Sequence, residues 1–351
     1  MKRWSEMVLG GHPDKLCDQF VDALLAEAYK VDDDAYGQVE AGIWCDQIWL
    51  SGALALRSPL PRSVEDVIRA AGVAIGVEMG RYRFADHLCV YERDGREWTH
   101  HVNDQAIVIG WAGYDAKTRW LSPEHFLAHS FREALASFGP DGKLLIQIRE
   151  VGTGLRAAWH LEMVLLTVQQ PVGASFLGFC GEVLRAIAGA WEGVRQADDR
   201  WKTPWSDVET LVNPNGPLEG GGSDFDNGQT GRKLVMDYYG PRVPLGGGAL
   251  SGKHLTHIDR LAAYNARRAA IHAVQTGASE CLIQTCWAPN VPRPLEVSWR
   301  SRGRGNKFAD QWFEFDAMRG RFPTSSIAQD LGLGTHFWGS NLPWNQSELE
   351  L

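Results

Sequence analysis

Strand-like and helix-like segments follow one another in mixed order along this chain, and that order restricts the folds it can adopt. Apolar residues three and four apart predict helices, and alternating or β-branched runs predict strands. The expected helices are 13–30, 63–76, 122–139, 175–191 and 257–275. The expected strands are a pair within 38–56, followed by 104–114, 142–151, 158–170 and 232–240. This order predicts an α+β or α/β fold with several small sheets.

Single residues mark where some of these helices begin and end. Pro13 suits the first turn of its helix, and Ser63 and Ser122 are expected to cap theirs. Gly139 is expected to stop the third helix.

The composition limits the size and the partners of the protein. Its 351 residues, 44% of them apolar, are enough for a buried core and, at about 150 residues each, for two or three domains. A net charge of −8 argues against a nucleic-acid partner, which usually requires a basic surface. The cysteines form no CxxC pair, and no run of about 20 apolar residues is present. We therefore expect a cytoplasmic protein with no nucleic-acid or membrane partner.

The stretch "GGHPDK" places His12, Asp14 and Lys15 at the entrance of the first helix. The free N–H groups and partial positive charge of a helix N-terminus favour an anion there, and Lys15 adds to that charge. Asp14 can hold a divalent cation that bridges phosphates. In the simpler alternative, Asp14 only complements the helix dipole and His12 is a turn residue.

A second cluster lies in "NPNGPLEGGGSDFDNGQTGRKL", residues 213–234. Its glycines keep the backbone open to a ligand, and Arg232 and Lys233 follow at the start of an expected strand. Paired cations beside a glycine loop suit phosphate binding. The alternative is a mobile surface loop followed by a solvated pair of charges.

A third cluster, "GGGALSGKHLTHID", nearly matches the phosphate-binding P-loop, but His254 stands where that motif needs Ser or Thr. Thr256 and Asp259 form a capping box, which starts the helix too late for a P-loop and offers Asp259 a purely structural role. Lys253 remains a candidate phosphate ligand. Three loops that combine glycine, cations and carboxylates suit a polyphosphate with more than one metal ion.

In this order, "GHPDK", "VNDQAIVIGWA", "GSDFDNGQTGRK", "GGGALSGK" and "THFWGSNLPW" resemble segments of the S-adenosylmethionine synthetase (methionine adenosyltransferase) family. The resemblance spans nearly the whole chain. It implies three similar α+β domains about a pseudo-threefold axis, which we place at 1–98, 99–215 and 216–351. It also implies a homodimer with active sites between subunits, often paired into a tetramer.

The resemblance implies a reaction in which the sulfur of methionine attacks C5′ of ATP and the triphosphate leaves. The triphosphate is then cut to phosphate and pyrophosphate. Two Mg²⁺ ions and one K⁺ ion are the implied cofactors. Preorganised cations suit such a leaving group, because its negative charge develops in the transition state.

The resemblance also assigns roles to single positions, of which His12, Lys143, Arg232 and Lys253 are the implied catalytic residues. The implied ATP and phosphate contacts are His12, Lys15, Asp141, Lys143, Arg232, Lys233, Lys253 and His257. The implied contacts of the amino-acid substrate are Asp104 and Asp226, with Ala53 at a third such position. The implied metal ligands are Asp14 and Asp259 for Mg²⁺ and Glu40 for K⁺.

Five departures from the family pattern fall at or near these positions. Ala53 replaces a glutamate that contacts the methionine ammonium, and His257 replaces a lysine. Gly10 replaces another glutamate, and Leu218 replaces an aromatic residue on which adenine stacks. The loop that closes over the site is shortened to residues 92–103. The triphosphate residues are thus retained, whereas those that recognise the amino acid and adenine are altered.

These observations leave three functional hypotheses. The first is an adenosyltransferase that joins ATP to L-methionine, and the second is the same reaction on a different thioether. The third is a non-catalytic, regulatory member of the family. The retained cations and carboxylates argue against the third, because a regulatory protein has no need of them.

Overall fold

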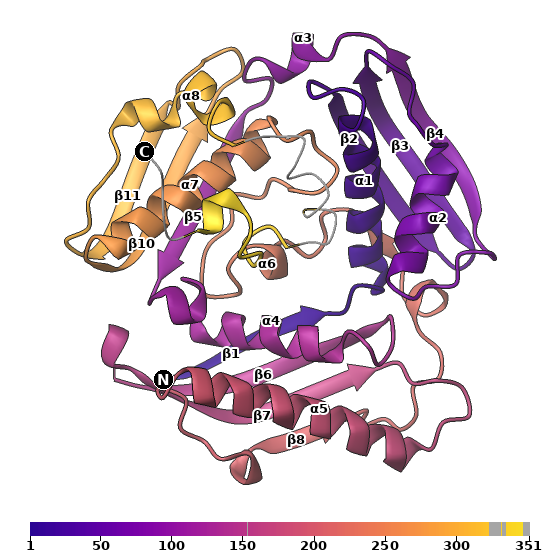
Figure 1. Ribbon diagram of the computed structural model, residues 1–351, viewed down its shortest axis with the longest axis vertical. Coiled ribbons are helices and arrows are strands. Elements are labelled where there is room, and N and C mark those ends of the chain that lie inside the picture. The colour runs from indigo at the N-terminus through magenta and orange to yellow at the C-terminus, as the bar shows by residue number, and fades with distance from the viewer. Residues whose placement is uncertain (153, 323–330, 332–334, 347–351) are drawn as a thin grey trace.

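The computed structural model describes residues 1–152, 154–322, 331 and 335–346, which form three small sheets with helices packed on them (Figure 1). The first sheet has the spatial order β4 (Arg83–Glu92), β3 (Gln47–Leu56), β2 (Tyr36–Trp44) and β9 (Gly228–Gln229). The second has the order β1 (Lys2–Val8), β6 (Gly142–Val151), β7 (Ala158–Val168) and β8 (Glu209–Val212). The third has the order β5 (Ala106–Gly113), β10 (Ala278–Trp287) and β11 (Glu296–Gly303).

Three long helices lie toward the middle of the molecule, as Figure 1 shows. These helices are α1 (Pro13–Tyr29), α4 (Pro123–Leu135) and α7 (Ile258–Gln275). Two further helices pack against α1 and α4, namely α2 (Val64–Ala74) and α5 (Phe176–Ala197). The short helices are α3 (Arg96–Thr99), α6 (Leu234–Asp237) and α8 (Phe315–Arg319). The architecture is α+β, as the sequence predicts.

The three units repeat one chain order, in which a strand is followed by a long helix and an antiparallel hairpin. The hairpins are β2–β3, β6–β7 and β10–β11. The first strand of each unit pairs with the hairpin of another unit instead of with the hairpin of its own. β1 pairs with β6, β5 with β10, and β9 with β2. Each of the segments 1–98, 99–215 and 216–351 therefore supplies a strand to another segment's sheet. Residues 323–330, 332–334 and 347–351 of the last segment lie outside the described residues.

The predicted helices are all present, but one of them ends early. Helix α4 stops at Leu135, so the expected stop at Gly139 is wrong. Gly139 instead allows a close approach of two backbone segments, because a Cβ at this position would lie 2.4 Å from the carbonyl oxygen of Gln169. The predicted cap at Ser63 is confirmed, since its hydroxyl accepts the Asp66 N–H at 3.1 Å. Ser122 occupies the cap position of α4, but its side chain forms no capping hydrogen bond.

The predicted strand at 232–240 is wrong, because this segment contains the short helix α6. Gly231 and Gly240 lie on either side of this helix with φ angles of +76° and +79°, a backbone conformation that glycine adopts without steric cost. Lys233 turns toward the entrance of α1 instead of joining a sheet. A run of apolar and aromatic residues matched a strand pattern here without any strand partner in the described structure.

Helix α1 has the predicted apolar stripe, and its polar face is buried as well. Leu16, Phe20 and Leu24 are all at most 2% exposed. On the polar face, Arg260 of α7 donates to Asp22 at 2.8 Å, and these side chains are only 1% and 2% exposed. The two helices are therefore joined by a buried ion pair, and their N-terminal ends carry the candidate site.

Candidate active site

Helices α1 and α7 begin with the same local structure. In each, a histidine occupies the N-cap and an aspartate lies two residues later. The Asp14 N–H donates to Nδ1 of His12 at 3.3 Å, and the Asp259 N–H donates to Nδ1 of His257 at 3.2 Å. Both histidine side chains are 1% exposed. Each entrance thus presents a carboxylate where a helix has free N–H groups and partial positive charge.

The capping box predicted for α7 is therefore wrong. His257 is the N-cap, and the hydroxyl of Thr256 instead donates to the carbonyl oxygen of Thr99 at 2.9 Å. The Thr256 hydroxyl, which the local pattern predicts as a helix cap, bonds to the 92–103 segment instead. Asp259 is consequently free of the structural role that a capping box would have given it.

At the α1 entrance, the first and second predicted clusters come together around Asp14. Its Oδ1 accepts the Gln229 N–H at 2.9 Å and lies 3.4 Å from Nη1 of Arg232. Its Oδ2 pairs with the ammonium of Lys233. The Asp14 side chain is 1% exposed, whereas Arg232 reaches solvent. The glycine-rich segment therefore carries two cations to the carboxylate that the sequence marked as a metal ligand.

His12 completes this entrance as a neutral ring. Burial, followed by the positive charges of Lys233 and Lys143, lowers the pKa of His12 to about 4. Its Nε2 lies 3.6 Å from Oδ2 of Asp226, whose side chain is half exposed. A neutral imidazole with Nδ1 as acceptor carries its proton on Nε2. It can therefore donate a hydrogen bond toward the open side of the site.

Lys15 is held away from solvent by two carboxylates that the sequence analysis missed. Its ammonium donates to Oδ1 of Asp237 at 2.5 Å and lies 3.1 Å from Oδ2 of Asp18. Burial opposes the charge, but Asp18 and Asp237 together raise the pKa of Lys15. The i,i+3 spacing of Lys15 and Asp18 on a helix is a sequence signal for their contact. A direct contact of Lys15 with phosphate stays a prediction.

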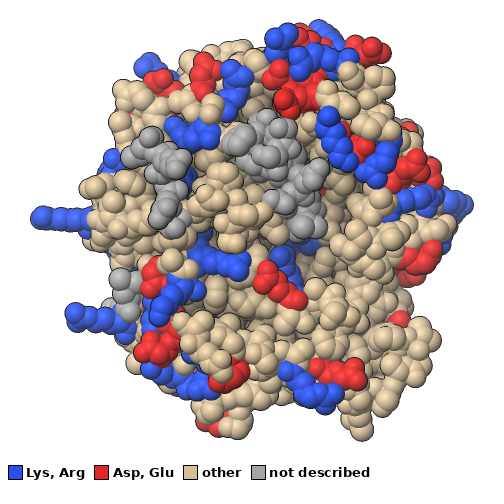
Figure 2. All heavy atoms as spheres, viewed as in Figure 1, with Lys and Arg blue, Asp and Glu red and all other residues tan. Residues whose placement is uncertain are grey.

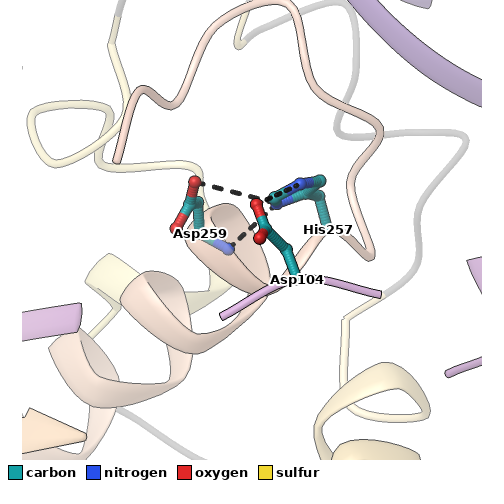
Figure 3. Close-up of side chains that lie close together, drawn as sticks. All are labelled: Asp104, His257 and Asp259. Carbon is teal, nitrogen blue, oxygen red and sulfur yellow. Dashed lines mark hydrogen bonds and ion pairs between the residues drawn. The ribbon is translucent and has the colours of Figure 1, made fainter. Parts of the chain in front are cut away.

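At the α7 entrance, Asp104, His257 and Asp259 lie close together (Figure 3). Nε2 of His257 is 3.9 Å from Oδ2 of Asp104, and its Nδ1 is 3.9 Å from Oδ2 of Asp259. The ammonium of Lys253 pairs with Asp259. Burial, followed by Lys253 and Arg260, lowers the pKa of His257 to about 3, so the ring is neutral at neutral pH.

Strand β2 connects the two entrances. The loop before α7 is hydrogen-bonded to it, since the Val39 N–H donates to Gly252 O at 2.8 Å. Glu40 lies on the same strand, where burial raises its pKa while Lys253 and the hydroxyl of Thr230 act against that rise. Glu40 therefore lies near Lys253 of the α7 entrance and beside Thr230, in the segment that leads to Arg232. Its carboxylate and the Thr230 hydroxyl are oxygen donors of the kind that K⁺ requires.

Asp141 and Lys143 lie where β6 begins, next to the "GGHPDK" loop. The Gly11 N–H donates to Pro140 O at 2.7 Å, which fixes the loop on this strand. Asp141 Oδ2 accepts the Gly222 N–H at 2.7 Å, in the wall of a cavity of about 410 Å³. Lys143 is exposed and is near enough to lower the pKa of His12. The structure thus gathers these predicted residues at the α1 entrance.

The positions predicted to face the amino acid are divided between the entrances. Asp226 lies beside His12 at α1, and Asp104 lies beside His257 at α7. Ala53 lies on β3 opposite Gln38, which in turn forms a β-bridge with Lys253. Gln38 therefore lies between Ala53 and Lys253 of the α7 entrance.

The short 92–103 segment is packed against the α7 entrance. It contains α3, and its residues Thr99 and Val102 are buried. Thr256 donates to Thr99 O, and the Asn290 N–H donates to Val102 O at 2.8 Å. This end of the segment is thus attached to the rest of the protein rather than extended into solvent.

Charged side chains of both signs are interspersed over the face shown in Figure 2. The described residues on this face form no single broad basic surface. Among the described residues, no helix is both long and apolar enough to cross a membrane.

The protein is an α+β protein of three sheet-and-helix units that exchange strands, with similar charged residues at the entrances of two long helices. Residues 2–93 match the model of the S-adenosylmethionine synthetase N-terminal domain, and residues 220–341 match that of the C-terminal domain. The chain belongs to the S-adenosylmethionine synthetase family, as its motifs indicate.

Relatives that are S-adenosylmethionine synthases share moderate identity with this chain over most of its length. An S-adenosylmethionine synthase of Roseobacter denitrificans is 31% identical over 332 residues, covering 86% of this chain and 81% of the relative. S-adenosylmethionine synthase 1 of Rhodospirillum rubrum is 31% identical over 92% of this chain and 86% of its own. A solved structure described as an unusual S-adenosylmethionine synthetase, from Campylobacter jejuni, superposes with a TM-score of 0.84. It covers 99% of this chain and 97% of its own at 20% identity, and it supports the fold.

Proposed function

We propose that this protein transfers the adenosyl group of ATP to a thioether sulfur, with L-methionine as the simplest acceptor. The observation that carries the proposal is the pair of entrances at α1 and α7. Each combines a buried carboxylate with a lysine, Asp14 with Lys233 and Asp259 with Lys253. Glu40 on β2 lies near Lys253 of the second pair. Such an arrangement suits a triphosphate, which requires several cations along its length.

The residues at the entrances also fit the divalent ions that a triphosphate carries. Asp14 and Asp259 supply carboxylate oxygens, the donor type that Mg²⁺ prefers. Their lysine partners could then bind the phosphate oxygens instead. Bound Mg²⁺ would neutralise phosphate charge and so favour departure of the triphosphate. The oxygen donors of Glu40 and Thr230 fit K⁺ in the same manner.

The proposed reaction forms a bond between the acceptor sulfur and C5′ of ATP as the bond from C5′ to the triphosphate oxygen breaks. The electron pair leaves with the triphosphate, and the sulfur becomes a sulfonium. Lys143 and Nε2–H of His12 would stabilise the oxygen that gains charge, since both lie at the α1 entrance. Arg232 and Lys253 would bind the triphosphate while water cleaves it to phosphate and pyrophosphate.

The direct test is incubation of the protein with ATP, Mg²⁺ and a panel of thioethers. Mass spectrometry would identify adenosylated products, and phosphate and pyrophosphate would be measured separately. The proposal requires one sulfonium product with both phosphate species. A regulatory, non-catalytic protein would yield none of the three, and that result would exclude the proposal.

The identity of the acceptor depends on Ala53, which leaves one partner of the usual ammonium site absent. Asp104 and Asp226 remain, and their side chains are about half exposed. An acceptor other than methionine is therefore the second candidate.

We expect the parent to bind L-methionine weakly and to tolerate thioethers without an amino group. Loss of one partner of a charge contact typically costs about 2–5 kcal/mol, which is more than tenfold in affinity. Ala53→Glu should shift the preference back toward methionine. The measurement is kcat/KM for methionine and for its desamino analogue in both proteins. A parent that rejects the desamino compound by a factor of about 1000 would show that the ammonium is fully recognised without this glutamate.

We also propose that the protein is a homodimer that can pair into a tetramer. Large aromatic side chains are exposed on the strands of two sheets, with Trp4, Trp44 and Trp49 each more than 40% exposed. Grouped apolar exposure of this kind is typical of subunit contacts.

All six cysteines are free, which supports a reducing compartment such as the cytoplasm.

Trp49→Glu is expected to convert the dimer to a monomer, because a charge would be buried in the contact without a partner. Light scattering coupled to size exclusion measures the mass directly. Leu177→Glu is the matched control, since Leu177 is 82% exposed but lies on helix α5 rather than on a sheet. A Trp49→Glu protein that remains dimeric would place the contact elsewhere.

A further inference from the structure

We propose that Asp18 positions Arg232 and Lys233 for the triphosphate, which rests on the phosphate-binding role proposed above for these cations. Oδ1 of Asp18 accepts the Gly231 N–H at 2.8 Å, directly before the two cations. The Asp18 side chain is only 1% exposed. Because it is buried, Asp18 acts on a ligand through the segment that it holds, as a positioning residue.

Three aspartates lie four residues apart on α1, and each accepts one backbone N–H from a loop of the site. Asp14 Oδ1 accepts the Gln229 N–H at 2.9 Å. Asp22 Oδ1 accepts the Gly252 N–H at 3.0 Å. Asp18 lies between these two aspartates. Residues four apart share one face of a helix, so this face of α1 is a rigid support for both glycine-rich loops.

The same local arrangement occurs before the first cation of each loop. Gly231 precedes Arg232, and Gly252 precedes Lys253. These glycines have φ angles of +76° and +82°, a conformation that other residues rarely adopt. In both loops, an aspartate of α1 accepts the N–H of this glycine. The direction in which the chain presents each cation therefore depends on a turn that α1 holds in place.

Asp18 is also connected to the far end of its segment through Lys15. The Lys15 ammonium lies 3.1 Å from Asp18 Oδ2 and donates to Asp237 Oδ1 at 2.5 Å. Asp237 is the last residue of α6, which begins directly after Lys233. The side chains of these three charged residues are at most 6% exposed. Arg232 and Lys233 thus lie between two buried contacts with α1, one on each side of them.

Asp32 distinguishes positioning from a general contribution to stability. It is a second buried carboxylate of the same unit, with its side chain 0% exposed, and it accepts the Arg57 N–H at 2.8 Å. Arg57 belongs to neither helix entrance. Asp32→Ala therefore removes a comparable buried contact without releasing the segment that carries Arg232.

The test uses the whole protein with Mg²⁺ and inorganic tripolyphosphate, without thioether. Calorimetry measures the affinity, and hydrogen exchange at single residues measures protection of the Gly231 N–H. Asp18→Ala should speed exchange of this N–H by about 10-fold or more. It should also weaken tripolyphosphate binding by about 10-fold or more, because the cations are no longer held in place. Asp32→Ala should leave both quantities within about threefold of the parent, even if its free energy of unfolding falls.

Two further variants separate the contacts of Asp18. Asp18→Asn keeps an oxygen that can accept the Gly231 N–H but has no charge opposite Lys15, so it should lose less protection and less affinity than Asp18→Ala. Asp237→Asn leaves the Gly231 contact in place and should weaken tripolyphosphate binding by about threefold or more. This variant covers the case that Asp18→Ala does not fold.

Three results would disprove the role of Asp18. The first is an Asp18→Ala protein that binds tripolyphosphate within about threefold of the parent. The second is equal impairment of Asp18→Asn and Asp18→Ala, and the third is a loss of affinity in Asp32→Ala as large as in Asp18→Ala. A parent that does not bind tripolyphosphate would instead contradict the proposed function itself, which the parent alone reveals before any variant is compared.

Discussion

Lys143→Ala is expected to lower the turnover of sulfonium formation by about 100-fold or more while ATP binding changes little. Lys143 lies at the start of β6, beside the loop that carries His12, and its charge reaches that ring. If it donates to the oxygen that leaves C5′, its interaction is stronger in the transition state than in bound ATP. Removing such an interaction affects kcat more than substrate affinity.

Two measurements separate these effects. Single-turnover product formation reports the chemical step, and equilibrium binding of ATP reports the ground state. Lys202→Ala is a suitable control, because Lys202 is also an exposed lysine and lies next to β7 in the same unit. Turnover of Lys143→Ala within about threefold of the parent would remove Lys143 from the proposed mechanism.

Asp22→Ala is expected to destabilise the fold by about 3–5 kcal/mol, because it leaves the guanidinium of Arg260 buried without its partner. Arg260 is 1% exposed, and its Nη1 lies 2.8 Å from Asp22 Oδ1. The same oxygen accepts the Gly252 N–H at 3.0 Å, so the loop that carries Lys253 would lose an anchor too. This single carboxylate therefore joins α1, α7 and the loop that carries Lys253.

Urea unfolding at fixed protein concentration measures the loss, and the slope of the transition shows whether the unfolded state has changed. Glu97→Ala is the control, since Glu97 forms an i,i+4 ion pair with Arg93 in which both side chains are more than half exposed. Such exposed pairs contribute about 0–1 kcal/mol. Equal losses in the two variants would show that the buried pair has no special weight. Replacing both Asp22 and Arg260 with apolar residues should recover part of the loss.

The charged residues at the two helix entrances could be predicted from local sequence, whereas Glu40, Asp104, Asp141, Lys143 and Asp226 were implied only by the family resemblance. "GHPDK" predicts a helix N-terminus with a carboxylate and a cation, and "GRK" and "SGK" follow glycine-rich runs. The structure brings Arg232 and Lys233 to Asp14, and Lys253 to Asp259. These motifs are short because each residue's role depends on the geometry of a single turn or helix end. Their spacing in the chain is therefore informative without knowledge of the fold.

Other features depended on contacts between distant segments. One of the two carboxylate partners of Lys15 is Asp237, which is 222 residues away in the chain. Local pattern also misplaced the cap of α7, because the Thr256 hydroxyl bonds to Thr99 across the interface with the 92–103 segment. The run at 232–240 resembled a strand, but a strand requires a neighbouring strand. The segment instead contains the short helix α6, with a glycine of positive φ on either side.

The sequence by itself predicted the five longer helices, the strands of the β2–β3 and β6–β7 hairpins and the chemical character of the two entrances, because apolar periodicity and short motifs act within a few residues. It did not predict strands β1 and β4 or the β10–β11 hairpin. Only the tertiary structure decided that β1, β5 and β9 leave their own units to complete neighbouring sheets. It also decided that the polar face of α1 is buried against α7 rather than exposed to water. The physical reason is that strand pairing and burial are satisfied by whichever segments meet in space. No local pattern specifies that partner.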